Sequence, residues 1–312
     1  MLGDTREVGL MPSVVLVTGS STGIGRLAVE TVARAGHVVY ASMRDVNGRN
    51  ASASDALQRL AEENSLALRP LEMDVRDADS VRRAVDLVRT AADRIDVVVN
   101  NAGLMSIGLA EGFTEEQVRH QMDVNFMGPV RVCRAVLPQM RAQRRGLIIH
   151  VTSIVGRLLF PGCALYCASK FAHEAFAEVL NYELTGTGVE SVIVEPGPYP
   201  SQLLPNSPGP ADAKRNAEYG DLSAIRDNFV AHFSQLFASK DAPRTQDVAD
   251  AILRLIELPA GARPMRTVCG LDFGASGLNE QIAPVQADVL RALGMDRMIP
   301  GLVSDHIGKA SA

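Results

Sequence analysis

Tyr166 and Lys170 are the two residues whose types and spacing are best suited to chemistry. A free tyrosine has a pKa of roughly 10, so it exchanges protons at neutral pH only where a nearby positive charge stabilises its phenolate. Residues four apart lie on one face of a helix, which allows the Lys170 ammonium to supply that charge. The pair predicts a proton-transferring tyrosine, against the alternative of an ordinary amphipathic pair on a helix surface.

Ser153 is the third candidate for chemistry. It follows an apolar run that is typical of a strand, where its hydroxyl could hydrogen-bond a substrate oxygen and hold it against Tyr166. Taken alone, Ser153 could equally cap a helix or a turn. The catalytic interpretation gains support only from its combination with a glycine-rich turn near the start of the chain.

That turn covers residues 18–25, which read Thr-Gly-Ser-Ser-Thr-Gly-Ile-Gly, and it lies between a predicted strand and a predicted helix. Glycines let the backbone turn tightly and allow a pyrophosphate to approach the exposed N–H groups and the positive end of the helix dipole. Such turns also serve as simple connections, so the glycines alone are weak support for a nucleotide site. Their position between strand and helix favours nucleotide binding.

The elements that must position these residues follow from the hydrophobic pattern, in which short β-branched runs alternate with longer runs of helical period. The predicted strands are Val14–Thr18, Val38–Ala41, Ala67–Met73, Val97–Asn100, Leu147–Thr152, Ser191–Glu195 and Arg266–Cys269. The predicted helices are Ile24–Ala35, Ala53–Glu63, Ala78–Ala92, Glu115–Arg141, Ala164–Leu184 and Gln246–Leu258. We expect an α/β fold, a Rossmann-type, doubly wound parallel sheet of seven strands.

The chain of 312 residues is expected to form one such domain over residues 13–270, after a short leader at 1–12. Six prolines lie between Pro196 and Pro210, and the residues after them, 211–240, are only weakly helical. We therefore expect an insertion over about 198–245 that acts as a substrate lid. Residues 271–312 form a C-terminal extension with no clear pattern.

Composition excludes several classes of function. The formal net charge of −5 and the lack of Lys/Arg-rich runs argue against nucleic-acid binding. The four cysteines lack CxxC spacing and no signal peptide precedes them, so we expect reduced cysteines and a cytoplasmic protein. No apolar run has the length of a membrane span. The histidines show no metal-ligand spacing such as HExxH, and we expect no metal site.

Three ordered motifs extend the argument: the turn at 18–25, Asn-Asn-Ala-Gly at 100–103 and Tyr-x-x-x-Lys at 166–170. With them the chain resembles the short-chain dehydrogenase/reductase family over roughly Val14 to Gly270. The resemblance implies an oxidoreductase that transfers a hydride between NAD(P) and a carbonyl or alcohol carbon. Residues 39–45 also look like those of the hydroxysteroid and retinol dehydrogenase branch. Long helices such as Glu115–Arg141 and Ala164–Leu184 pack between subunits in relatives, so the resemblance implies a homodimer or homotetramer.

The resemblance implies a catalytic set of Asn125, Ser153, Tyr166 and Lys170, in which Asn125 orients a water that links the lysine to solvent. Asp74 would meet the adenine amino group, although it could also be only a helix cap. Tyr199 and Ser201 stand where the family usually has a smaller apolar residue and a threonine. The implied cofactor-binding residues are Gly19, Ser21, Thr22, Gly23, Ile24, Gly25, Arg44, Asp74, Val75, Asn101, Ala102, Gly103, Tyr166, Lys170, Pro196, Gly197, Tyr199 and Ser201.

The choice between NADP and NAD depends on the end of the second predicted strand. An acidic residue there pairs with the ribose hydroxyls and repels a 2′-phosphate, whereas an arginine attracts one. Ser42 and Met43 are uncharged and Arg44 follows them, which favours NADP(H). NAD(H) stays open, because Asp45 would reach the ribose after a shift of one residue and Arg44 could be a solvated loop residue.

The predicted substrate contacts are largely apolar, namely Met105, Val155, Cys163 and Leu203, together with Ser153 and Tyr166. Such a pocket suits a bulky apolar ketone or alcohol. We expect reduction of such a ketone with NADPH. The alternatives are an NAD-dependent, hydroxysteroid-like alcohol dehydrogenase and a non-catalytic nucleotide-binding redox sensor.

Overall fold

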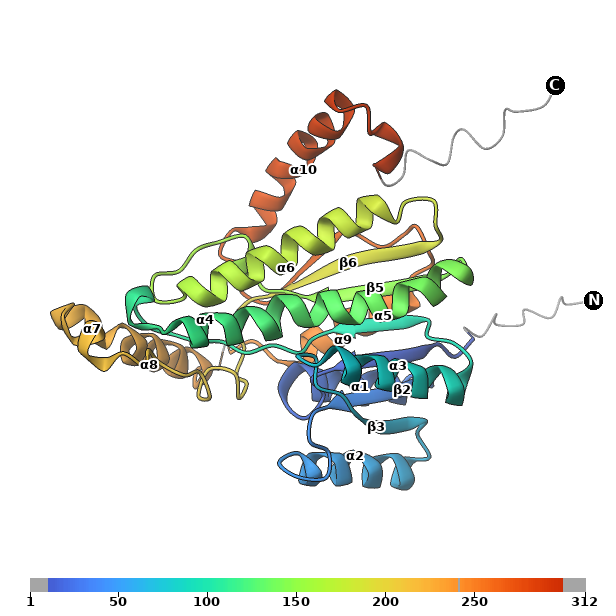
Figure 1. Ribbon diagram of the computed structural model, residues 1–312, viewed down its shortest axis with the longest axis horizontal. Coiled ribbons are helices and arrows are strands. Elements are labelled where there is room, and N and C mark those ends of the chain that lie inside the picture. Colours follow the sequence, from blue (N-terminus) through green and yellow to red (C-terminus); the bar gives the residue numbers. More distant parts are fainter. Residues whose placement is uncertain (1–10, 241, 300–312) are drawn as a thin grey trace, which may run out of the picture.

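A computed structural model describes residues 11–240 and 242–299 of the chain (Figure 1). Its centre is a seven-stranded sheet in the order β3-β2-β1-β4-β5-β6-β7, and every neighbouring pair is parallel. The predicted doubly wound Rossmann-type fold is confirmed. The strands are β1 (Val14–Thr18), β2 (Val38–Met43), β3 (Leu68–Glu72), β4 (Val97–Asn100), β5 (Gly146–Val151), β6 (Val189–Pro196) and β7 (Arg266–Cys269).

Both faces of the sheet are covered by helices. Alternate residues of β1 point to opposite faces, so Val15 and Val17 join one apolar core while Val14 and Leu16 join the other. The first core is completed by α1 (Gly23–Arg34), α2 (Ala51–Asn64) and α9 (Gln246–Glu257). The second is completed by α3 (Ala78–Ala92), α5 (Gly128–Ala142) and α6 (Ala164–Glu183). Burial on both faces explains why the central strands β1, β4 and β5 are largely apolar runs, whereas β3 and β7 at the two edges of the sheet carry polar residues.

The prediction of one continuous helix over Glu115–Arg141 was wrong. The segment divides into α4 (Glu115–Met122), a π-helical turn η2 (Asp123–Met127) and α5. Pro129 at the start of α5 has no N–H to donate to the carbonyl of Asn125, so the regular ladder cannot continue there. A π turn accommodates the break and is frequent at functional sites.

The insertion after β6 contains α7 (Ala213–Ala217), a 3₁₀ turn η4 (Gly220–Ala224) and α8 (Ile225–Phe237). None of the residues in these three elements is fully buried. In Figure 1, α7 and α8 extend beyond one edge of the molecule, beside α4. The helical part of the predicted lid therefore packs loosely on the body, whereas Tyr199, Leu204 and Ser207 in the part before it are buried.

The C-terminal extension contains α10 (Ala275–Ala292) and a 3₁₀ turn η5 (Asp296–Met298), and α10 projects away from the sheet (Figure 1). The predicted leader falls mainly on residues 1–10, which lie outside the described residues, as do 300–312. Two further 3₁₀ turns are η1 (Ala110–Gly112) and η3 (Ile154–Gly156). Within 11–240 and 242–299, no helix combines the length and apolar character needed to cross a bilayer.

Candidate active site

A cavity of about 790 Å³ opens at the carboxyl ends of the central strands. It is lined by the glycine turn after β1, the ends of β4 to β6, the start of α6 and the segment after β6. All the residues predicted to bind cofactor or substrate lie in its wall, and of the predicted catalytic residues only Asn125 does not. The fold thus brings together residues spread from position 19 to position 203.

The glycine turn is held by the Asn-Asn-Ala-Gly segment. The Thr18 hydroxyl accepts hydrogen bonds from the backbone N–H groups of Asn101 and Ala102 at 3.0 and 2.9 Å, and the Asn101 amide donates to the Thr18 carbonyl at 2.9 Å. A Cβ on Gly25 would lie 2.2 Å from the carbonyl oxygen of Gly19, so no larger residue fits there. The two motifs form one rigid unit at the opening of α1.

Tyr166 and Lys170 lie on α6 with side chains turned into the cavity wall, 7% and 4% exposed. The Lys170 ammonium donates to the carbonyl of Val151 at 3.0 Å and lies 5.8 Å from the centre of the Tyr166 ring. Tyr166 is hydrogen bonded to Ser153, whose hydroxyl also donates to the carbonyl of Pro196 at 3.2 Å. The predicted serine, tyrosine and lysine therefore form one hydrogen-bonded and electrostatically linked group.

Burial dominates the acidities of this pair. It raises the pKa of Tyr166 above its ordinary value, an effect that the hydrogen bond to Ser153 opposes. It lowers the pKa of Lys170 to about 8, while the nearby Glu174 carboxylate opposes that change. The charged form is disfavoured for both groups in the low-dielectric wall. At neutral pH the site therefore holds a neutral phenol beside a predominantly cationic lysine.

Asn125 is fully buried in the π turn, behind the cavity wall. Its amide oxygen accepts from the N–H of Leu104 at 2.9 Å, and its amide nitrogen donates to the Leu104 carbonyl at 2.8 Å and to the Ser169 hydroxyl at 2.9 Å. Its side chain thus joins the segment after β4 to α6. The side chains of Asn125 and Lys170 both approach Gly103. A Cβ added to Gly103 would lie 3.5 Å from the Asn125 amide oxygen and 3.7 Å from the Lys170 ammonium.

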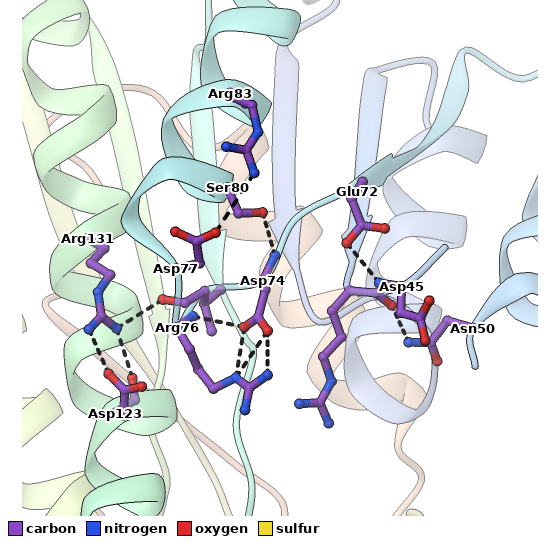
Figure 2. Close-up of polar contacts among 12 residues, drawn as sticks. Asp45, Asn50, Glu72, Asp74, Arg76, Asp77, Ser80, Arg83, Asp123 and Arg131 are labelled. Carbon is purple, nitrogen blue, oxygen red and sulfur yellow. Dashed lines mark hydrogen bonds and ion pairs between the residues drawn. The ribbon is translucent and has the colours of Figure 1, made fainter. Parts of the chain in front are cut away.

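The carboxylate of Asp74, which was expected to meet the adenine amino group, is instead paired with an arginine that the sequence did not single out. Arg76 donates to both carboxylate oxygens, its Nη2 at 2.6 Å from Oδ2, and these bonds lower the pKa of Asp74 (Figure 2). The Asp74 N–H donates to the Ser80 hydroxyl at 3.0 Å, so Ser80 fixes the strand end against α3.

Arg44 lies between this pair and Arg49, in a second hollow lined also by Asp45 and Glu72. Partial burial lowers the pKa of Arg44, and the positive charges of Arg76 and Arg49 lower it further. The Asp45 carboxylate accepts the Arg49 N–H at 2.9 Å within its own loop. The Asp45 N–H in turn donates to Glu72 at 2.8 Å (Figure 2).

The opposite end of the cavity is apolar and aromatic. Besides the predicted Met105, Val155, Cys163 and Leu203, it is lined by four phenylalanines that the sequence reasoning missed: Phe160, Phe229, Phe233 and Phe237. The last three recur every four residues along α8, with ring centres 4.7 and 5.9 Å apart. This four-residue spacing within a weakly helical stretch is the sequence signal from which these three phenylalanines could have been predicted.

Tyr199 lies in the cavity wall, 5% exposed, with its ring against Gly270 and its hydroxyl without a hydrogen-bond partner among the described residues. The four cysteines are free and buried. Over residues 11–240 and 242–299, no cluster of three or more histidine, cysteine or acidic side chains is placed to hold a metal ion.

Comparison with known proteins agrees with this geometry. Residues 13–208 match the family model of the short chain dehydrogenases. Over 212 residues, 68% of this chain and 73% of its relative, the chain is 35% identical to a 3-ketodihydrosphingosine reductase of Bacteroides thetaiotaomicron. It is 34% identical to human 17-beta-hydroxysteroid dehydrogenase type 1 over 79% of this chain and 75% of that protein. A short-chain dehydrogenase structure from Streptomyces avermitilis superposes with a TM-score of 0.69 at 28% identity, covering 92% of this chain and 98% of the other.

The chain belongs to the short-chain dehydrogenase/reductase family, and its similarity to hydroxysteroid and retinol dehydrogenases confirms the predicted branch. It is an oxidoreductase of this type, acting with NAD(P) on a C–OH or carbonyl group.

Proposed function

We propose that this enzyme reduces bulky apolar ketones with NADPH, with Tyr166 as the proton donor. NADPH supplies a hydride to the carbonyl carbon when it is bound along the glycine turn. Tyr166 gives its phenolic proton to the carbonyl oxygen, Ser153 hydrogen-bonds that oxygen, and Lys170 stabilises the phenolate that remains. The observation that carries this proposal is a neutral, buried Tyr166 placed between Ser153 and Lys170 in the wall of an apolar cavity.

Asn125 completes the proposed set by holding Leu104 and α6 in place. Two of its bonds go to the backbone of Leu104 and one to Ser169, which is the residue before Lys170. We propose that it keeps Lys170 at a fixed distance from the cavity and supports a water path from the lysine to solvent.

The preference for NADPH is supported by three arginines at the adenosine end. Arg44, Arg49 and Arg76 line one hollow, and their mutual repulsion is already felt at Arg44. A 2′-phosphate placed among them would relieve that repulsion and accept charge-assisted hydrogen bonds. Among the described residues, Arg76 is the only one of the three in an ion pair, with Asp74, so we propose that Arg44 and Arg49 carry most of the phosphate binding.

A bulky apolar substrate is supported by the phenylalanines of α8. We expect Phe233→Ala to raise the KM for a long-chain or polycyclic ketone by roughly ten- to a hundredfold, because burial of one such side chain contributes about 1.5–3 kcal/mol. The KM for a small ketone should change little, since a small molecule bound at Tyr166 does not extend to α8. Steady-state reduction of both ketones, with Leu222→Ala on the exposed η4 turn as a control, tests this expectation.

We propose that residues 202–240 close over the cavity when cofactor and substrate are both bound, which would exclude water from the reacting atoms. Hydrogen exchange of the backbone amides measures this directly. Protection over α8 should rise when NADPH and a ketone analogue are added together, and less with either one alone. High protection in the free enzyme, unchanged by ligands, would mean that the segment is a fixed wall.

Assembly into a homodimer or homotetramer is also part of the proposal. It is supported by apolar side chains left exposed along α6, namely Phe171 and Val179 at 38% and 51%.

A further inference from the structure

Two buried glutamates lie directly behind the catalytic pair. Glu174 follows Lys170 by one helical turn on α6 and is 2% exposed, and Glu195, in β6, is wholly buried. Both are near the Arg266 guanidinium, whose Nε lies 2.8 Å from Oε1 of Glu174 and 3.4 Å from Oε1 of Glu195, and the negative charge of Glu174 raises the pKa of Glu195. Glu195 immediately precedes Pro196-Gly197 in the cavity wall, so the pair joins α6 to the strand that ends beside the site.

The partners of the four carboxyl oxygens show how the two groups can be this close. Arg266 donates from Nε to Oε1 of Glu174 at 2.8 Å, and Asn279 donates from its amide to Oε2 of Glu195 at 2.6 Å. Two oxygens remain, Oε2 of Glu174 and Oε1 of Glu195, and both are buried without a donor among the described residues. Two ionised carboxylates have no proton to share, so one of the two must be protonated.

Glu195 is the member that holds the proton. Glu174 receives the shorter contact from the Arg266 guanidinium, which lies 3.4 Å from Oε1 of Glu195 without forming a hydrogen bond to it. Burial raises the pKa of Glu195, and the negative charge of Glu174 raises it further. A proton on Oε1 of Glu195, donated to Oε2 of Glu174, gives both remaining oxygens a partner.

Other polar and titratable groups lie around the pair. Arg266 also donates to Glu178 at 2.6 Å, and the Tyr182 hydroxyl donates to Glu178 at 2.6 Å. Arg157, beyond η3, donates to the Asn279 amide oxygen at 2.8 Å. The buried His150 and His173 bond to each other at 2.8 Å, and burial lowers the pKa of both, so they stay neutral.

We propose that Glu174 and Glu195 share one proton, and that the charge left on Glu174 is a positioning charge that holds Lys170 in its cationic form and thereby sets the pH at which Tyr166 loses its proton. The inference rests on the proposed function of Tyr166 and Lys170. The Lys170 ammonium has a single neutral acceptor, the Val151 carbonyl, among the described residues, and a buried cation needs an anion nearby. Glu174 also lies beside η3, the turn after Ser153, because a Cβ added to Gly156 would lie 3.3 Å from its Oε2.

The pH profile of kcat/KM for ketone reduction tests the positioning charge. Glu174→Gln removes an anion, so Tyr166 and Lys170 should lose protons more readily, and the alkaline limb should move to lower pH by roughly half to one unit. Glu174→Asp should return it toward the wild-type position. Glu195→Gln should leave the limb in place, because a neutral amide replaces a carboxylic acid that is already neutral. Glu178→Gln, which removes the other Arg266 partner two turns from Lys170, is the matched control and should not move it.

Either of two results would overturn the proposal: an unmoved limb in Glu174→Gln, or an equal shift in Glu195→Gln. Should Glu174→Gln fail to fold, infrared spectroscopy of the wild type and Glu195→Gln still decides about the shared proton. A carboxylic-acid C=O band should be present at neutral pH in the wild type and lost in Glu195→Gln. Two spectra without that difference would rule out the shared proton. This measurement needs no turnover, so it separates failure of the shared proton from failure of the proposed function.

Discussion

Replacing Tyr166 by phenylalanine is expected to lower kcat by roughly a hundred- to ten-thousandfold, the usual contribution of one placed acid or base. The substitution removes only the hydroxyl that would donate the proton, while the ring keeps its place among Ile154, Val155 and Cys163. Cofactor affinity should remain within about twofold, because the glycine turn and the arginines are untouched. Stopped-flow reduction of an apolar ketone, together with a fluorescence titration of NADPH, measures both quantities.

The matched control for this variant is Tyr182→Phe, on the same helix, whose hydroxyl bonds to Glu178 outside the cavity. It should keep wild-type kcat. Retention of more than about half of the wild-type kcat by Tyr166→Phe would mean that another group donates the proton.

Arg44→Ala is expected to weaken NADPH binding by roughly ten- to a hundredfold while changing NADH binding little. One charge-assisted hydrogen bond to phosphate contributes about 1.5–3 kcal/mol. NADH lacks the 2′-phosphate, so its binding does not include this hydrogen bond. The effect should stay near the lower end, because Arg49 lines the same hollow and can take over part of the contact. Binding titrations of both cofactors measure the difference.

Arg83→Ala offers the control for that titration, since Arg83 is an exposed arginine of α3 outside both cavities, 3.8 Å from Asp77. It should bind both cofactors as the wild type does. An equal loss of NADPH and NADH affinity in Arg44→Ala would assign Arg44 a structural role and reopen the choice of NAD.

The sheet could be predicted from the sequence because its central strands β1, β4 and β5 are buried on both faces and therefore appear as separate, largely apolar runs. Even β7, with four residues, was found at its observed bounds. The break at Asn125 was missed because the apolar period of α4 and α5 continues across the π turn, and only Pro129 indicated it. Helix α10 was missed because Gly277 and Pro284 interrupt its pattern.

The candidate site was predictable to the extent that it is built from ordered motifs. Tyr166, Lys170 and Ser153 stand at fixed distances from strands that the pattern locates, and the structure brings them together. Arg76 could not be found in this way, because its contact with Asp74 depends on the turn between β3 and α3. The Glu174–Glu195 pair was hidden for the same reason, since it joins residues 21 positions apart across two elements.

Transfer of deuterium from NADPH that carries deuterium at both C4 positions of the nicotinamide to the product of ketone reduction tests the central claim most directly. With a long-chain or polycyclic ketone, the wild-type enzyme should place the deuterium on the carbinol carbon of the alcohol, as read by mass spectrometry. Tyr166→Phe should bind the labelled cofactor and form little of this product. Unlabelled alcohol, or no alcohol from any apolar ketone while NADPH binds normally, would contradict the assignment of this chain as an NADPH-dependent ketone reductase.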